Sequence, residues 1–139
     1  MLLCDQLSRN CFRGTDEAFA YDDTAVACCR ALMSKRGLWT AYAPAQLTFL
    51  LTPGQHSEDL RDHEANMDVI RHLEEALGEG DPFTKTMRGF VVDHMTVVER
   101  FGRYPHRNAV LGRASTAEEE AYLADVDHLP GWAKSQLKK

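Results

Sequence analysis

The sequence lacks a long hydrophobic run and an excess of basic residues, and both absences exclude functional classes. Its most apolar stretch, residues 47–51, is much shorter than the roughly 20 residues needed to cross a membrane. The chain carries 16 lysines and arginines against 21 aspartates and glutamates, a net charge of −5. A general nucleic-acid binder needs a basic surface that displaces counterions. We therefore expect neither nucleic acid nor a membrane as a partner.

Cysteine is scarce and poorly spaced. The four cysteines are Cys4, Cys11, Cys28 and Cys29, two of them adjacent, with no C-x-x-C pair. This spacing argues against a disulfide framework or a zinc site and favours inert buried thiols, above all for Cys28 and Cys29 in an apolar helical stretch. The chain also begins without the basic and apolar segments of a signal peptide. A reducing compartment, the cytoplasm, is therefore expected.

Familiar catalytic motifs are missing as well. The sequence contains no Walker loop, no dinucleotide-binding fingerprint, no nucleophile elbow and no H-E-x-x-H pair. We expect no cofactor, and whether the protein is an enzyme stays open at this point.

What the sequence does contain is a repeated helical pattern. Its 139 residues suffice for one domain with an ordinary core, over residues 1–139. Apolar residues recur at spacings of three and four, short polar turns separate the segments, and no stretch is typical of a sheet. The predicted fold class is all-α, with helices over residues 1–9, 22–36, 44–51, 57–77, 82–101 and 117–126.

The two longest predicted helices have clear end signals. Ser57 is the expected N-cap of the first, and Gly78 ends it. Asp81 caps the second, with Pro82 at its first position and Gly102 after its last. Their apolar stripes are Leu60, His63, Met67, Ile70, Leu73 and Leu77, and Phe83, Met87, Val91, His94, Val98 and Phe101.

Other boundaries rest on local signals. Pro53-Gly54 should end the helix that begins at residue 44. Thr116 with Glu119 is a capping box for the helix over 117–126. Pro130 should break that helix and leave the lysine-bearing tail frayed.

A basic stretch follows the second long helix. After Glu99 no acid occurs until Glu118, whereas arginines stand at Arg100, Arg103, Arg107 and Arg113, with His106 among them. Guanidinium groups bind carboxylate or phosphate with a bidentate fork, so the stretch is a candidate anion site. The alternative is that these arginines pair with acids near the start of the 57–77 helix and hold the loop down.

The two long helices also bring histidines together. If they form an antiparallel hairpin, His63 and His94 lie close along the axis, and Asp59 lies beside the loop that carries His106. Such a set ligates a metal or supplies an acid and a base, but a hydrogen-bonded polar network is the more common arrangement. We expect no stoichiometric metal.

The end of the first helix adds further polar residues. Asp5 and Arg9 are four residues apart on one face, and Asn10, Arg13 and Gly14 form the exit from the helix. Arg9 and Arg13 either extend the cationic site or only stabilise the helix end.

At these polar blocks the sequence resembles a known family, the nine-hundred-and-twenty-fourth domain of unknown function. The similar text stands here at residues 2–14, 18–22, 56–59 and 100–119, and the likeness extends from residue 2 to about residue 123. The resemblance implies tetratricopeptide-like stacked pairs of antiparallel helices. It carries no activity, cofactor or catalytic residue.

The chain departs from the family pattern in two ways. Leu7 and Ser8 replace a usual phenylalanine and proline, and family members carry further helical sequence before the first block. We therefore expect one of three explanations: the chain is truncated, its start codon is misassigned, or it is a naturally shortened member. The face of Leu2, Leu3, Leu7 and Phe12 should then lack its cover and favour self-association.

Three functional hypotheses follow. The preferred one is a small helical module that binds an anionic small molecule or an acidic peptide end. The second is a hydrolase that uses Asp59, His63 and His106. The third is a tetratricopeptide-like scaffold for protein interaction. The ligand-binding residues expected for the first are Arg9, Asn10, Arg13, Asp59, His63, Arg103, His106, Arg107 and Asn108.

Overall fold

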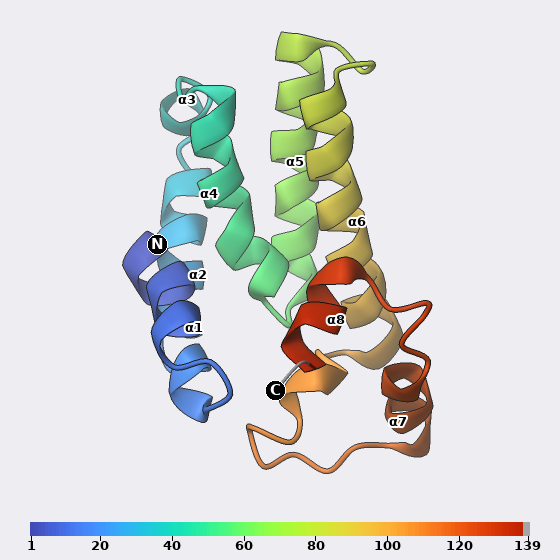
Figure 1. The fold of residues 1–139 in the computed structure, drawn as a ribbon. Helices are drawn as coiled ribbons and strands as arrows, with labels where there is room; N and C mark the ends of the chain where they lie inside the picture. Colours follow the sequence, from blue (N-terminus) through green and yellow to red (C-terminus); the bar gives the residue numbers. More distant parts are fainter. Residues whose placement is uncertain (138–139) are drawn as a thin grey trace.

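The computed structural model describes residues 1–137, and all its regular elements are helices, as the sequence predicts (Figure 1). This part of the chain contains eight α-helices, one π-helical segment and two 3-10 segments. In chain order they are η1 (Leu3–Leu7), α1 (Ser8–Cys11), η2 (Asp16–Phe19), α2 (Asp22–Met33), α3 (Arg36–Trp39), α4 (Pro44–His56), α5 (Leu60–Leu77), α6 (Pro82–Phe101), η3 (Pro105–Arg107), α7 (Ala117–Ala124) and α8 (Gly131–Leu137).

Four helices form the body of the molecule. Helices α2, α4, α5 and α6 lie side by side and alternate in direction, and α5 packs on both α4 and α6 (Figure 1). Each presents one apolar stripe to the others, which is the way an amphipathic helix removes apolar surface from water. The core comprises Cys29, Trp39, Leu47, Leu50, Leu51, Val69, Ile70, Leu73, Met87 and Val91. A finer likeness to tetratricopeptide stacking stays a prediction.

Most end signals of the two long helices work as expected. The Asp81 carboxylate accepts a hydrogen bond from the Thr84 amide at 3.0 Å, Pro82 opens α6, and Gly102 ends it with φ of +68°. For α5 the predicted N-cap is wrong, because Asp59 caps it by accepting from the Arg61 amide. Ser57 instead donates to Asp62 at 2.5 Å and accepts from the Asp59 amide.

Helix α4 passes through the proline that was expected to end it. Pro53 lies inside the helix, which continues to His56. The missing N–H removes one backbone bond, but packing against α5 keeps the segment helical. The side chain of Asn66 in α5 donates to the Leu51 carbonyl at 2.9 Å, and Gly54 lies directly against it. The extra turn carries His56 to the lower end of the bundle.

The C-terminal region is helical where it was expected to be frayed. The capping box of Thr116 and Glu119 opens α7, which ends at Ala124, two residues earlier than predicted. After Pro130 the chain forms α8, which contacts η3, and Trp132 packs in a second apolar cluster with Val97, Val98 and Tyr104. The prediction of a frayed tail is therefore wrong for residues 131–137. Lys138 and Lys139 lie outside the described residues.

The four thiols are free, and one of them is buried. Cys29 is buried, donates to the Leu50 carbonyl, and has a pKa that burial raises to about 11. Cys28 is exposed, contrary to expectation, because it faces away from the core on α2. In residues 1–137, no helix combines the length and apolarity required to cross a bilayer. Leu3 and Leu7 of η1 are 73% and 51% exposed.

The close approach of α4 and α5 predicts the effect of one substitution. A Cβ at Gly54 would lie 2.7 Å from the Asn66 side chain, so Gly54→Ala should push the helices apart and weaken the bond from Asn66 to the Leu51 carbonyl. We expect a loss of about 1–3 kcal/mol in the free energy of unfolding, measured by urea denaturation.

Gly89→Ala is the matched control. Gly89 is exposed in the middle of α6 with no atom within 4 Å of the new Cβ, so this change should stabilise by up to about 1 kcal/mol. Equal stability of Gly54→Ala and the parent would contradict the tight contact.

Candidate functional site

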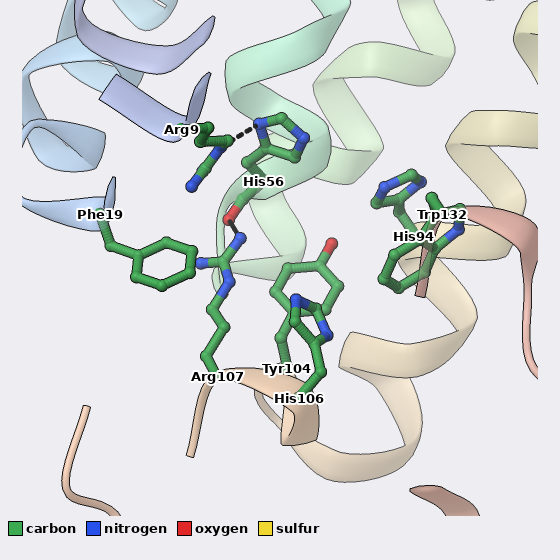
Figure 2. Close-up of a pocket in the computed structure, with 8 residues that line it drawn as sticks. All are labelled: Arg9, Phe19, His56, His94, Tyr104, His106, Arg107 and Trp132. Atoms are coloured by element: carbon green, nitrogen blue, oxygen red, sulfur yellow. Dashed lines mark hydrogen bonds between the residues drawn. The ribbon is translucent and has the colours of Figure 1, made fainter. Parts of the chain in front are cut away.

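A small, partly enclosed cavity lies where the lower ends of α4 and α6 meet the η3 loop and α8 (Figures 1 and 2). Its volume is about 60 Å³, enough for a few water molecules or a small polar group. Eight residues from separate parts of the chain line it: Arg9, Phe19, His56, His94, Tyr104, His106, Arg107 and Trp132.

A short polar contact at the cavity joins η1 of the N-terminal segment to the end of α4. The Nδ1 atom of His56 lies 2.5 Å from Oδ1 of Asp5. Two lone pairs would repel at this distance, so a hydrogen lies between the atoms. Burial alone would raise the pKa of Asp5, but its hydrogen bond to His56 and the charges of His56 and Arg9 lower it to about 2. Asp5 is thus ionised at neutral pH, and the proton is on His56.

This assignment fixes the tautomer of His56. With Nδ1 donating to Asp5, the other ring nitrogen, Nε2, is the one that carries the lone pair of the neutral ring. Burial lowers the pKa of His56, and the nearby Arg9 and Arg107 act in the same direction against Asp5. In Figure 2 Nε2 is on the side of the ring turned away from Arg9.

Arg9 holds the carboxylates in place. Its Nε lies 3.2 Å from His56 Nδ1 (Figure 2) and 3.2 Å from Asp5 Oδ1. Its Nη2 donates to both oxygens of Asp22 at 2.9 and 2.8 Å. Since the His56 Nδ1 already carries a proton, the Nε–H of Arg9 is directed to Asp5. Most of the donors of Arg9 are therefore engaged by protein acceptors.

Arg107 is a buried cation whose donors are only partly satisfied. Its side chain is 7% exposed, and its guanidinium carbon lies over the rings of Tyr104 and Phe19 at 4.5 and 4.9 Å. Nη2 donates to the His56 carbonyl at 2.9 Å, and Nη1 lies 3.4 Å from Asp22, a carboxylate that Arg9 already binds. Within residues 1–137 its Nε has no acceptor. Burial and the charge of Arg9 lower the pKa of Arg107 to about 10.

Aromatic rings form the remaining walls. His94 stacks on Trp132 with centroids 4.0 Å apart, and its Nδ1–H donates to the Phe90 carbonyl. His106 lies 5.5 Å from the Tyr104 ring, whose hydroxyl donates to the Gln55 carbonyl. Burial lowers the pKa of His94 and of His106 to about 3, so both rings are neutral at pH 7.

The structure brings some of the predicted site residues together and separates others. Arg9, His106 and Arg107 line the cavity. His63 is buried between helices, where Nε2–H donates to the Ser57 carbonyl. Asp59 pairs with Arg30 and Arg61 as the cap of α5. Asn10 and Arg13 are exposed and do not line the cavity.

The arginines of the basic loop were expected either to bind an anion or to pair with acids and hold the loop down. The contacts in the structure differ from one arginine to the next. Arg103 binds Glu119 at 2.6 and 2.8 Å, Arg100 pairs with Glu118, and Arg113 binds Glu58. Asn108 is buried and donates to Ser115 and Glu119. These contacts hold the loop against α7 and against the segment that precedes α5. Arg107 alone among the loop arginines lines the cavity in the described residues.

Sequence reasoning missed residues that line the cavity, among them His56 and Trp132, and also the carboxylate of Asp5 that binds His56. Asp5 and His56 stand in polar blocks that the family likeness marks, so a signal existed, but the chain separation of 51 residues hid their contact. Trp132 gave no signal, because the segment after Pro130 was expected to be frayed. Among residues 1–137, no three His, Cys, Asp or Glu side chains are arranged to hold a metal ion.

Comparison with known proteins places the chain in a family. Residues 1–127 match the family described as "Bacterial protein of unknown function (DUF924)". The chain belongs to this family. A solved structure of a protein of unknown function from Agrobacterium tumefaciens, ATU0120, is 36% identical with a TM-score of 0.68. The match covers 88% of this chain and 63% of that one. No curated protein matches significantly.

The Asp5 contact predicts how stability depends on pH. A carboxyl pKa lowered from 3.8 to about 2 stabilises the folded state by about 2 kcal/mol above pH 4, and this is lost as the pH falls through 2. Asp5→Asn should therefore be less stable than the parent at pH 7, and the difference should shrink between pH 4 and 2.

Urea denaturation at several pH values measures the difference. Asp68→Asn, which removes an exposed carboxylate paired only with Arg71, is the control and should change stability by under about 1 kcal/mol throughout. A difference between Asp5→Asn and the parent that does not depend on pH would argue against the lowered pKa.

Proposed function

We propose that this protein binds a small anionic group, a carboxylate or a phosphate, in the cavity beside Arg107. The observation that carries the proposal is the buried guanidinium with an Nε–H that lacks an acceptor in residues 1–137. A buried donor without a partner costs free energy, and a buried cation costs more. An anion that accepts from Nε would remove both costs.

The surroundings limit the size and charge of the ligand. The cavity of about 60 Å³ admits one small group. A cleft of about 490 Å³ shares Phe19, His56 and Arg107 with it and offers room for the rest of a ligand. Four carboxylates line that cleft, of which Asp22, Glu58 and Asp59 are paired with arginines and Asp23 has no ion pair in residues 1–137. Asp23 disfavours further negative charge, which supports a ligand with a single anionic group over an acidic peptide.

A second function is favoured by a separate observation. The contact of Asp5 with His56 at 2.5 Å orients a neutral imidazole at the cavity, as a general base requires. A hydrolase was expected to use Asp59, His63 and His106, but Asp59 and His63 are committed to contacts away from the cavity. Of the three predicted residues, His106 lines the cavity, and the acid–base chemistry we propose uses His56, which Asp5 orients.

Binding is tested by thermal unfolding with acetate, formate and phosphate, each compared with chloride at the same ionic strength. A ligand at about 100 times its Kd stabilises a protein by about 2.7 kcal/mol, which raises Tm by several degrees. We expect this rise in the parent and its loss in Arg107→Gln, with each Tm shift taken relative to the same protein without ligand.

Arg100→Gln is the matched control, since it removes an exposed arginine that pairs with Glu118 outside the cavity. It should keep the full response. If Arg107→Gln does not fold, Arg107→Lys replaces it, because lysine keeps the charge but has no Nε–H fork. An anion response that is equal in all variants would disprove the site.

A further inference from the structure

The Asp5–His56 contact gives the cavity a chemical capability beyond binding. Asp5 is 2% exposed and accepts from Gln6 at 2.6 Å as well as from His56 and Arg9, so its carboxylate is held from three sides. His56 is the last residue of α4, and its backbone carbonyl is bound by Arg107. The imidazole is thus fixed through both its ring and its main chain.

Two residues with complementary groups line this one small cavity. The lone pair of His56 Nε2 is a proton acceptor, and the structure gives this nitrogen no hydrogen-bond partner in residues 1–137. The Nε–H of Arg107 is a donor without an acceptor. A base beside a cationic donor is the arrangement that acyl transfer to water needs: one activates the water and the other stabilises the oxyanion.

We propose that Asp5 and His56 act as a base dyad that hydrolyses a short acyl ester or amide, whose acyl group enters the cavity and whose leaving group lies in the adjoining cleft. This proposal rests on the proposed anion binding, because the carboxylate that Arg107 would bind is then the product of the reaction. Asp5 is a positioning residue that fixes the tautomer, and His56 is the catalytic residue.

The step balances without a metal or cofactor. Water loses a proton to His56 Nε2 as its oxygen bonds to the acyl carbon, and the carbonyl electron pair moves to the oxygen facing Arg107. The tetrahedral intermediate then breaks its bond to the leaving oxygen or nitrogen, which receives the proton from His56. A carboxylic acid and an alcohol or amine leave, and Asp5 stays ionised throughout.

The cleft indicates the class of leaving group. Of the four carboxylates that line it, Asp22, Glu58 and Asp59 are paired with arginines, whereas Asp23 has no ion pair in residues 1–137. An amine takes up a further proton in water and departs as a cation, which the unpaired Asp23 attracts. The inferred natural substrate is therefore a short-chain N-acyl amine, and an acyl derivative whose leaving group carries a negative charge should react more slowly.

The test uses three probes with the purified chain: 4-nitrophenyl acetate as a general acyl donor, N-acetylputrescine as a cationic amide and N-acetylaspartate as an anionic one. We expect saturable hydrolysis of the first two and at least tenfold lower kcat/KM for the third. His56→Gln should lower kcat/KM at least 100-fold, whereas His128→Gln, which changes a histidine exposed on the surface, should not change it.

The positioning role of Asp5 is tested by a measurement that a purely structural role would not change. Nitrogen NMR of the imidazole should show a proton on Nδ1 and none on Nε2 at pH 7 in the parent, and a mixture of tautomers in Asp5→Asn. The kcat/KM of the parent should reach its plateau below pH 6.5, because burial lowers the pKa of His56. The charged and titratable groups that face this ring are Asp5, Arg9, Asp22, His94, His106 and Arg107.

The outcomes separate the two proposals. Acetate binding that persists in His56→Gln, with no hydrolysis of any probe by the parent, overturns the dyad and leaves the anion site intact. Hydrolysis that depends on His56 and Asp5, with no Tm response to any anion, supports the dyad and overturns the anion site. Hydrolysis that survives in His56→Gln overturns the dyad directly.

Discussion

The guanidinium of Arg107 is a cation held where water barely reaches it, and the elements around the cavity are arranged to compensate for this. It donates to the carbonyl at the end of α4, lies beside Asp22 at the start of α2, and stacks between Phe19 and Tyr104. A buried cation without such partners would cost several kcal/mol. The Arg107 guanidinium therefore contacts the N-terminal segment, the helical bundle and its own loop at once.

The ion pairs around the cavity balance the charge of Arg107 only in part. Arg9 takes both oxygens of Asp22 and also binds Asp5, so Arg107 shares a carboxylate that is already engaged. The other arginines of the basic loop have their own acids, Glu118, Glu119 and Glu58. One underpaired cation beside a small cavity is the observation from which both proposals start.

Much of the fold follows from local chemistry that is visible in the sequence. Asp81, Pro82 and Gly102 set the ends of α6, and Thr116 with Glu119 opens α7, because capping depends on residues within one turn. The errors occur where a tertiary contact outweighs a local signal. A proline ends many helices. At Pro53, however, Asn66 and Gly54 bring α5 against α4, and α4 continues to His56.

The sequence by itself determined the helices, the free thiols and the presence of an acid-free basic loop, since composition and short-range spacing specify these. Only the tertiary structure decided which loop arginine faces a cavity and which histidine meets a carboxylate. Asp5 and His56 are 51 residues apart, and Arg107 and Asp22 are 85 apart. Contacts of that separation arise from the packing of several helices at once, and no local pattern in the chain encodes them.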